Sequence, residues 1–243
     1  MKKIKKIAIL ILLSVITTTT MFTSCESIAN FRKTDEGALW LKSNDTYYIP
    51  CSVSVKAYAI GDLYGKVGDL ELYEIQFEAS DKFISEKENL LGGVYRRSDV
   101  PEITLGNFNA VAAQIYVIGE QDIIVGEFPA APEYLSESLT DDYEDGTPCT
   151  NAVVDAILGD NIAIIPAQVD EDTIFHIRLL SPDYPGLTYT VIFMMDINGD
   201  CFLYDRSTQK CVVCPEIIKD KMIGTGDETS DISEAESEQT ASE

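Results

Sequence analysis

The sequence predicts a β-rich α+β fold, made mostly of antiparallel strands and hairpins with one short helix near residues 148–158. Three observations support this prediction. Several stretches between residues 51 and 214 have apolar residues at every second position, a period typical of half-buried strands. Asn198-Gly199 separates two such stretches and is the strongest short signal for a hairpin turn. Residues 147–158 carry apolar residues at helical spacing instead.

The expected strands follow from this alternation and from the turn residues between them. In chain order they cover residues 51–59, 111–118, 122–128, 162–165, 173–180, 187–195, 200–204 and 211–214. Gly119-Glu120-Gln121 joins the second strand to the third, which predicts a hairpin. Asn198-Gly199 predicts another hairpin, to which the last strand adds as a meander. Residues 82–91 fit either a short helix or a hairpin.

The expected helix has recognisable ends. Thr147 is a suitable cap, Pro148 suits the first helical position, and Gly159 suits the end. Its apolar face consists of Cys149, Ala152, Val153, Ala156 and Ile157. We therefore expect Cys149 to be a small residue of the core.

Composition divides the chain into six segments. They are a signal peptide (1–24), a lipid-anchored polar tether (25–37), an N-terminal β-rich half (38–132), an acidic linker (133–146), a C-terminal α+β half (147–223) and a disordered acidic tail (224–243). The tail holds seven acids and no base, so burial cannot offset the entropy of ordering it. Short matches in conserved order, such as Tyr95-x-Arg97-Ser98 with Tyr204-x-Arg206-Ser207, favour two related β-rich halves.

The N-terminus combines a positive, an apolar and a small-residue segment. Four lysines lie among residues 2–6, an apolar run follows at 7–16, and Thr23-Ser24-Cys25 ends the segment. This is the layout of a secretory signal peptide, and the run is too short to span a bilayer. Residues 22–25 resemble the lipobox of bacterial lipoproteins, with Phe22 in place of the usual leucine. The resemblance implies that Cys25 is acylated and anchors the chain to the extracytoplasmic face of a bacterial membrane; an ordinary signal peptide cleaved elsewhere is the alternative.

The chain is strongly acidic. It holds 18 basic and 41 acidic residues, a net charge of −23, and loss of the four signal-peptide lysines changes this to −27. Such a surface repels nucleic acid and anionic lipid. We therefore expect no nucleic-acid partner, and membrane attachment only through the lipid on Cys25. A basic envelope protein or a cation would fit this charge, although solubility alone also explains it.

Five cysteines remain besides Cys25, an odd number that cannot all pair within one chain. A turn centred on Ser207-Thr208 would bring Cys201 opposite Cys214, which makes this pair a candidate disulfide; reduced cysteines are the alternative. Cys211 and Cys214 form a C-x-x-C motif. The β-branched residues between them favour a strand, in which they point to opposite faces, so redox and zinc roles are not favoured.

Several familiar catalytic motifs are missing from the sequence. His176 is the only histidine, which excludes two-histidine zinc motifs, and no G-x-S-x-G elbow or P-loop is present. Residues 196–200 resemble the start of a calcium loop, but Gly199 is at the fourth position rather than the sixth. Asn198-Gly199 also explains this segment as a plain turn. No catalytic residue, cofactor or metal ligand is predicted.

These observations favour a lipid-anchored, extracytoplasmic protein that acts in binding or assembly at the bacterial cell surface and is not an enzyme. Two alternatives remain open. One is a hydrolase acting on cell-envelope material, and the other is a calcium-stabilised structural module.

Overall fold

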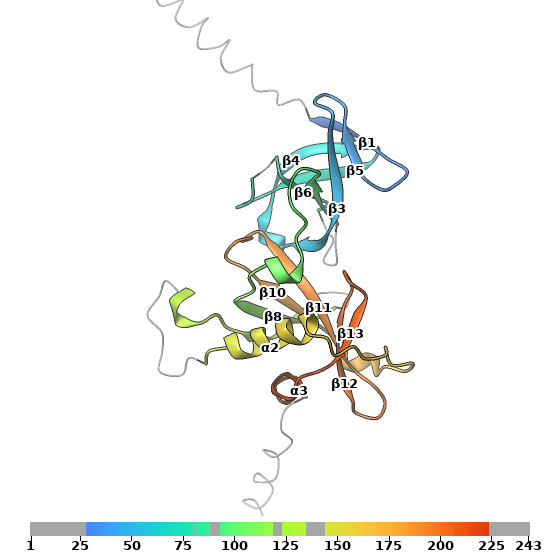
Figure 1. Cartoon of the computed structure of the whole chain (residues 1–243). Helices are drawn as coiled ribbons and strands as arrows, with labels where there is room; N and C mark the ends of the chain where they lie inside the picture. The colour runs from blue at the N-terminus through green and yellow to red at the C-terminus, as the bar shows by residue number, and fades with distance from the viewer. Residues whose placement is uncertain (1–27, 80, 88–92, 119–122, 135–143, 224–243) are drawn as a thin grey trace, which may run out of the picture.

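The computed structural model describes residues 28–79, 81–87, 93–118, 123–134 and 144–223. Within these residues, thirteen strands join into one hydrogen-bonded sheet accompanied by two α-helices. The fold is β-rich and mostly antiparallel, as the sequence predicts. Its strands form two parts, a closed barrel from β1 to β7 and an open sheet from β8 to β13 (Figure 1).

Seven strands form the barrel. They are β1 (Ala29–Lys33), β2 (Leu39–Leu41), β3 (Thr46–Val55), β4 (Ile60–Val67), β5 (Leu70–Ile75), β6 (Phe83–Ser85) and β7 (Gly93–Arg97). The barrel closes because β1 pairs with β2 on one side and, in parallel, with β4 on the other, while β2 also pairs with β3. The remaining pairs are antiparallel. Phe31, Tyr48 and Leu72 are buried inside.

Gly65 on β4 allows β1 to approach closely enough for closure. A Cβ at this position would lie 2.5 Å from a ring carbon of Phe31 and 2.7 Å from the carbonyl oxygen of Ala29. The carbonyl oxygen belongs to the backbone of β1, so it cannot move aside alone. Any larger residue at position 65 would therefore push β1 away from β4.

The second part is a six-stranded antiparallel sheet with helices packed on it. Its strands are β8 (Ala112–Val117), β9 (Ile123–Phe128), β10 (Phe175–Leu180), β11 (Leu187–Met195), β12 (Cys201–Asp205) and β13 (Lys210–Val213), in the spatial order β9-β8-β10-β11-β12-β13. Helix α2 (Thr147–Leu158) lies over one face (Figure 1) and buries Cys149, Val153 and Ile157. Helix α3 (Glu216–Ile223) packs beside α2.

Strand β11 joins the two parts. One of its edges pairs with β10. Along the other edge, Leu187 and Thr188 pair with barrel strand β3, whereas the residues from Val191 onward pair with β12. One cluster of buried side chains crosses the junction, since Val53 of the barrel and Phe193 of the sheet both belong to it. The two parts therefore share a core.

The structure confirms the predicted helix and most predicted strands. Helix α2 has the expected bounds, with Cys149 in the core, although Gly146 rather than Thr147 occupies the cap position. The predicted strands from 111–118 onward correspond to β8–β13, with the exception of 162–165, which lies in an irregular segment. The prediction of a strand at 51–59 is only partly correct, because β3 ends at Val55 and a 3-10 helix follows. The helix alternative for 82–91 is wrong, because β6 and β7 form a hairpin.

Two predicted segments differ from the structure, and a third is described in part. The tether predicted for 25–37 is shorter, because residues 29–33 form β1 and bury Phe31 in the barrel. Strands β8 and β9, which the sequence placed in the half 38–132, pair with β10 and belong to the second part. Within the linker 133–146, residues 144–146 are described and lead into α2, and a short 3-10 helix ends at Tyr134.

The remaining organisational predictions are not tested. The signal peptide, residues 135–143 of the linker, and the acidic tail lie outside the described residues. The proposed duplication stays a prediction. Tyr95 and Arg97 lie on β7, and Tyr204 lies on β12. Strand β7 belongs to the closed barrel and β12 to the open sheet.

Neither described helix is long and apolar enough to cross a membrane.

Candidate functional site

The candidate disulfide residues face each other as the sequence predicts. Strands β12 and β13 pair with Leu203 opposite Val212, and the backbone N–H of Cys214 donates to the carbonyl oxygen of Cys201 at 2.8 Å. The five described cysteines are all free. Burial raises the pKa of the Cys214 thiol to about 12, so this thiol is protonated and slow to react at neutral pH. The bridge itself stays a prediction, and Cys25 lies outside the described residues.

His176 and Arg178 lie on the face of β10 that points away from α2. Both side chains are buried. Arg178 stacks on Tyr116 of β8, with 3.9 Å between the guanidinium carbon and the ring centroid. A buried guanidinium on an aromatic ring is a stabilising cation–π contact, so we assign Arg178 a structural role.

The segment that resembles a calcium loop forms the β11–β12 hairpin turn. Asp196 Oδ1 accepts hydrogen bonds from the N–H groups of Asn198 and Asp200, both at 2.9 Å, and Gly199 has a positive φ of 87°. These bonds lower the pKa of Asp196. The carboxylate thus satisfies its own turn. In the described part of the chain, no cluster of three or more histidine, cysteine or acidic side chains could hold a metal. The calcium-stabilised module stays a prediction.

The acidic stretch before α2 is engaged in local contacts where it is described. Glu144 pairs with Lys221 of α3 at 2.5 Å, and Asp145 accepts the N–H of Thr147 at 2.9 Å. The ion pair is exposed and adds little stability. These contacts fix the start of α2 rather than form a cation site.

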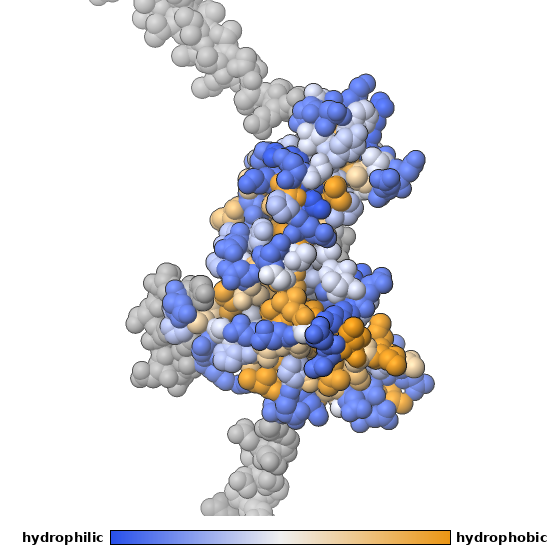
Figure 2. Space-filling view, viewed as in Figure 1, coloured by the Kyte–Doolittle hydropathy of each residue, from blue (hydrophilic) through white to orange (hydrophobic). Residues whose placement is uncertain are grey.

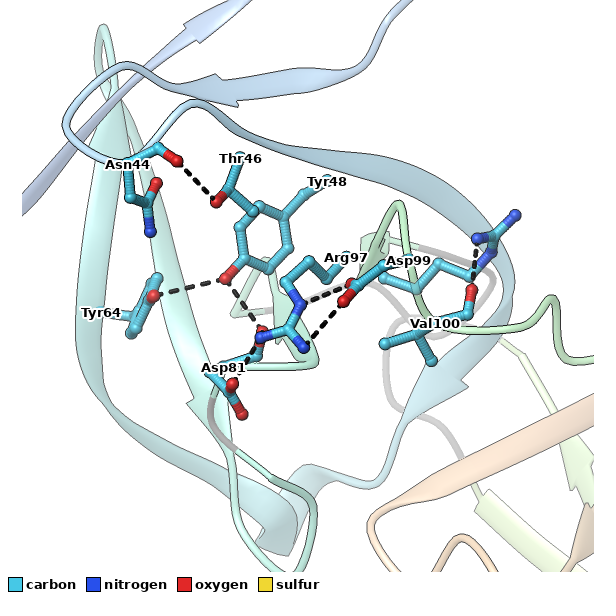
Figure 3. A network of polar contacts seen from close by, with 9 residues as sticks. Asn44, Thr46, Tyr48, Tyr64, Asp81, Arg97, Asp99 and Val100 are labelled. Carbon is cyan, nitrogen blue, oxygen red and sulfur yellow. Dashed lines mark hydrogen bonds and ion pairs between the residues drawn. The ribbon is translucent and has the colours of Figure 1, made fainter.

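A polar network on the barrel surrounds Arg97 (Figure 3). Its guanidinium binds Asp99 through two N–H groups, at 2.6 and 3.1 Å, and also pairs with Asp81. Tyr48 donates to the carbonyl oxygen of Asp81 at 3.1 Å and contacts the hydroxyl of Tyr64. The hydrogen bonds from Arg97 lower the pKa of Asp99. Each charge in this network already has a partner. We therefore interpret the network as a structural contact between β7 and the residues that lead into β6.

Replacing Arg97 by glutamine should therefore destabilise the protein in a pH-dependent way. The folded-state pKa of Asp99 lies below its unfolded value, so this carboxylate stabilises the fold above about pH 4 and loses its effect as pH falls through the folded pKa. We expect R97Q to be less stable than the parent at pH 7, and the difference to be smaller at about pH 3. Urea unfolding at both pH values measures this; R206Q, which removes an exposed charge, is the control. An equal loss at both pH values would contradict the electrostatic explanation.

A buried carboxylate lies at the junction of the two parts. Asp205, only 1% exposed, ends β12. It accepts hydrogen bonds from the Tyr189 hydroxyl at 3.0 Å, from the N–H of Ser207 at 2.9 Å, and from the hydroxyls of Ser207 and Thr208 at 2.8 and 2.7 Å. Burial raises the pKa of Tyr189, which stays a protonated donor. This cluster fixes the β12–β13 turn against β11.

A small polar cavity of about 180 Å³ opens beside this cluster, where β3 and β12 separate along β11. It is lined by Ser52, Ser54, Thr190, Arg206 and Ser207. Hydroxyls and one guanidinium suit hydrogen bonding to a small polar molecule. The hydroxyl of Ser207 donates to the Asp205 carboxylate at 2.8 Å, so its proton is already engaged in the buried cluster.

The free edge of β9 is the most unusual surface of the second part. Among the described strands β9 pairs only with β8, so its other edge is unpaired. Ile123, Ile124 and Val125 are 57%, 51% and 52% exposed, and they occupy both faces of the strand. Natural proteins normally protect edge strands with charges, proline or a covering segment, because an apolar edge recruits other strands. This edge carries a single charge, that of Glu127, within β9 itself.

The opposite edge of the same sheet, formed by β13, is partly covered by another segment. Strand β13 pairs with β12 and also receives, through Cys211, a hydrogen bond of 2.8 Å from the N–H of Ala163. The irregular segment around Ala163 thus lies along β13. It exposes Ile162, Ile164 and Ile165. Figure 2 shows that apolar side chains gather over the second part on this face of the molecule, whereas the barrel is mostly hydrophilic.

Comparison of the chain with protein-family models, with characterised proteins and with solved structures finds no match. The candidate site therefore stands on the geometry alone. The free edge of β9 was not predicted from the sequence, although one signal was present. Three consecutive apolar residues at 123–125 break the alternation of a half-buried strand. This pattern is typical of a strand that is buried on both faces.

Proposed function

We propose that the protein is a lipid-anchored, extracytoplasmic binding module at a bacterial cell surface, and that it holds a partner protein through the free edge of β9. The observation that carries this proposal is the edge of β9 that no described strand pairs with, together with Ile123, Ile124 and Val125, which are all more than half exposed. An extended segment can add to such an edge, with main-chain hydrogen bonds supplying affinity and side-chain contacts supplying specificity.

The charge of the protein defines the partner further. With a net charge of −27 after loss of the signal peptide, the protein repels acidic partners and attracts basic ones over distances of about a Debye length. Glu127 lies on β9 itself. The partner we propose is therefore an envelope protein that contributes an extended segment of apolar residues flanked by lysine or arginine. A second copy of this chain, equally acidic, fits less well.

The anchor adds a physical benefit to such binding. Acylation of Cys25 would confine the protein to the membrane surface, where a tethered pair meets at a raised effective concentration. Anchoring would be tested separately by intact mass. A mature protein that begins at Cys25 and carries acyl groups supports it, and one that begins at Cys25 without acyl groups refutes it.

Site-specific photo-cross-linking in the cells that produce the full-length protein tests the binding proposal. A photoreactive residue would replace Ile124, and the matched control would replace Ile197, which is 66% exposed in the β11–β12 turn. We expect one dominant adduct at position 124, none at position 197, and a cross-linked partner segment that is apolar with basic flanks. Equal adducts at both positions, no adduct at 124, or an adduct to a second copy of this chain would overturn the proposal.

A further inference from the structure

A groove of about 620 Å³ lies at the end of the barrel where the described chain begins. Its lining residues are Ile28, Ala29, Asn30, Phe31, Arg32, Leu41, Lys42 and Ser43. Phe31 and Leu41 are buried and form an apolar floor, and Ile28 is exposed at the rim. Two of the lining residues are cations and none is an acid. This is notable in a chain with 41 acids and 18 bases.

The cations of this groove are not neutralised within the described part of the molecule. Arg32 and Lys42 are exposed and make no ion pair there, whereas Lys66, Arg97 and Lys221 each pair with a carboxylate. Acids do occur nearby in the sequence, as Asp35, Glu36 and Asp45, but they do not line the groove. Within the described residues, Arg32 and Lys42 are thus available to an external anion.

An aromatic pair lies beside these cations. Arg32, Trp40 and Tyr47 occupy one row across β1, β2 and β3. Trp40 and Tyr47 stack with their ring centroids 6.2 Å apart and their planes 16° from parallel, and Trp40 donates to Asp45 at 2.9 Å. Tryptophan and tyrosine are enriched at membrane–water interfaces, because an apolar ring with a polar edge suits the headgroup level.

The position of the groove brings it close to the predicted anchor. Only two residues separate Cys25 from Ile28, so the two α-carbons can be at most about 11 Å apart. Strand β1, which directly follows Ile28, lies at the end of the barrel farthest from β12 and β13 (Figure 1). A lipid on Cys25 would therefore hold the groove at the bilayer surface and direct the second part away from it.

We propose that this groove binds the phosphate headgroups of the membrane's own phospholipids, with Arg32 and Lys42 contacting phosphate and the Trp40–Tyr47 pair lying at the interface. The proposal deepens the proposed function and rests on its lipid anchor. The net charge of the whole chain opposes adsorption to anionic lipid from solution. Docking therefore needs the tether, which supplies the effective concentration that the weak contacts lack. The contact orients the molecule so that the β9 edge faces outward.

The single tryptophan makes this contact directly measurable. The experiment uses residues 25–243 with an N-terminal polyhistidine tag, bound to vesicles that contain nickel-chelating lipid, phosphatidylglycerol and a brominated phospholipid that quenches nearby tryptophan. We expect strong quenching of Trp40 fluorescence on these vesicles. Each cation at an anionic surface changes the docking equilibrium about fivefold, so R32Q/K42Q should lower the docking constant about 25-fold. The matched control K82Q/R206Q removes two exposed cations elsewhere and should leave quenching unchanged.

Each result decides the proposal. Quenching that is absent, or that falls equally in R32Q/K42Q and K82Q/R206Q, would overturn it. So would loss of quenching on adding millimolar inorganic phosphate, which would indicate a site for a free anion instead of lipid. Both variants change exposed side chains, and an unchanged melting temperature would show that they fold. Because the tag replaces the native lipid, the result is independent of whether cells acylate Cys25, which intact mass decides.

Discussion

Replacing Asp205 by alanine is expected to destabilise the protein by about 2–4 kcal/mol, the largest stability effect we predict for a single polar side chain. The carboxylate is buried and accepts hydrogen bonds from Tyr189, Ser207 and Thr208. Its removal leaves the buried hydroxyl of Tyr189 with only the Ser207 hydroxyl as a partner, and releases the β12–β13 turn from β11. Urea denaturation of the variant and the parent measures the difference.

Two further variants separate the causes of this effect. D205N keeps the shape but offers one acceptor oxygen and an NH₂ group among donors, so it should also be destabilised, by about 1–3 kcal/mol. Y189F removes one donor and should cost about 1 kcal/mol, with a total for the double variant Y189F/D205A below the sum of the single losses. The control D62A changes an exposed carboxylate of β4 and should be within about 0.5 kcal/mol of the parent. A loss below this limit for D205A would contradict the structural role of the cluster.

Replacing Ile124 by lysine is expected to weaken partner binding by about tenfold to a hundredfold, which corresponds to about 1.4–2.8 kcal/mol. The side chain lies at the middle of the apolar stretch of β9, and a lysine there would add a charge that repels a basic segment and must be desolvated. The fold should tolerate the change, because the side chain is half exposed. Titration of the purified protein with a synthetic copy of the cross-linked partner segment measures the dissociation constant.

The sign of the introduced charge provides a sharper control. I124E disrupts the same apolar contact but attracts a basic segment, so it should bind more tightly than I124K. I197K makes the same chemical change on the β11–β12 turn, away from the free edge, and should bind like the parent. Equal binding by I124K and I197K would show that β9 does not make the contact.

Most of the second part of the fold could be predicted from the sequence, because apolar residues recur with a regular period in most of its strands. Strands β10 to β13 pair without a register shift, and α2 carries its apolar residues on one face. Even the register of β12 and β13 follows from one turn position, because sliding a strand by one residue would exchange its faces. The exception, 162–165, has apolar residues that the structure leaves exposed.

Much of the barrel could not be predicted from the sequence, for a physical reason. Strand β4 changes register twice in its pairing with β5, and β3 does so once between Cys51 and Ser54. Each irregularity bends the strand and shifts the alternation of buried side chains, so a period-2 search fails. Strand β1 is five residues long and buries only Phe31. Its position depends on closure with β4, a contact between residues more than thirty positions apart.

The candidate sites also divide into features that the sequence predicts and features that it does not. The facing positions of Cys201 and Cys214 are a local consequence of one hairpin and could be predicted. The β9 edge, the groove beside Arg32 and Lys42, and the carboxylate cluster of Asp205 depend on which strands end the sheet and which cross between its parts. Sequence patterns identify strands, but they do not state which edge remains unpaired.

Amide hydrogen exchange of β9 with and without the partner segment tests the central claim most directly. Unpaired amides on an exposed edge exchange rapidly, and addition of a strand would protect them by forming hydrogen bonds. We expect slower exchange at residues 123–128 when the synthetic partner segment is bound, with no change in the β11–β12 turn around Ile197. Unchanged exchange in β9, with protection appearing instead at residues 160–168, would contradict the account and place the binding surface at the other edge of the sheet.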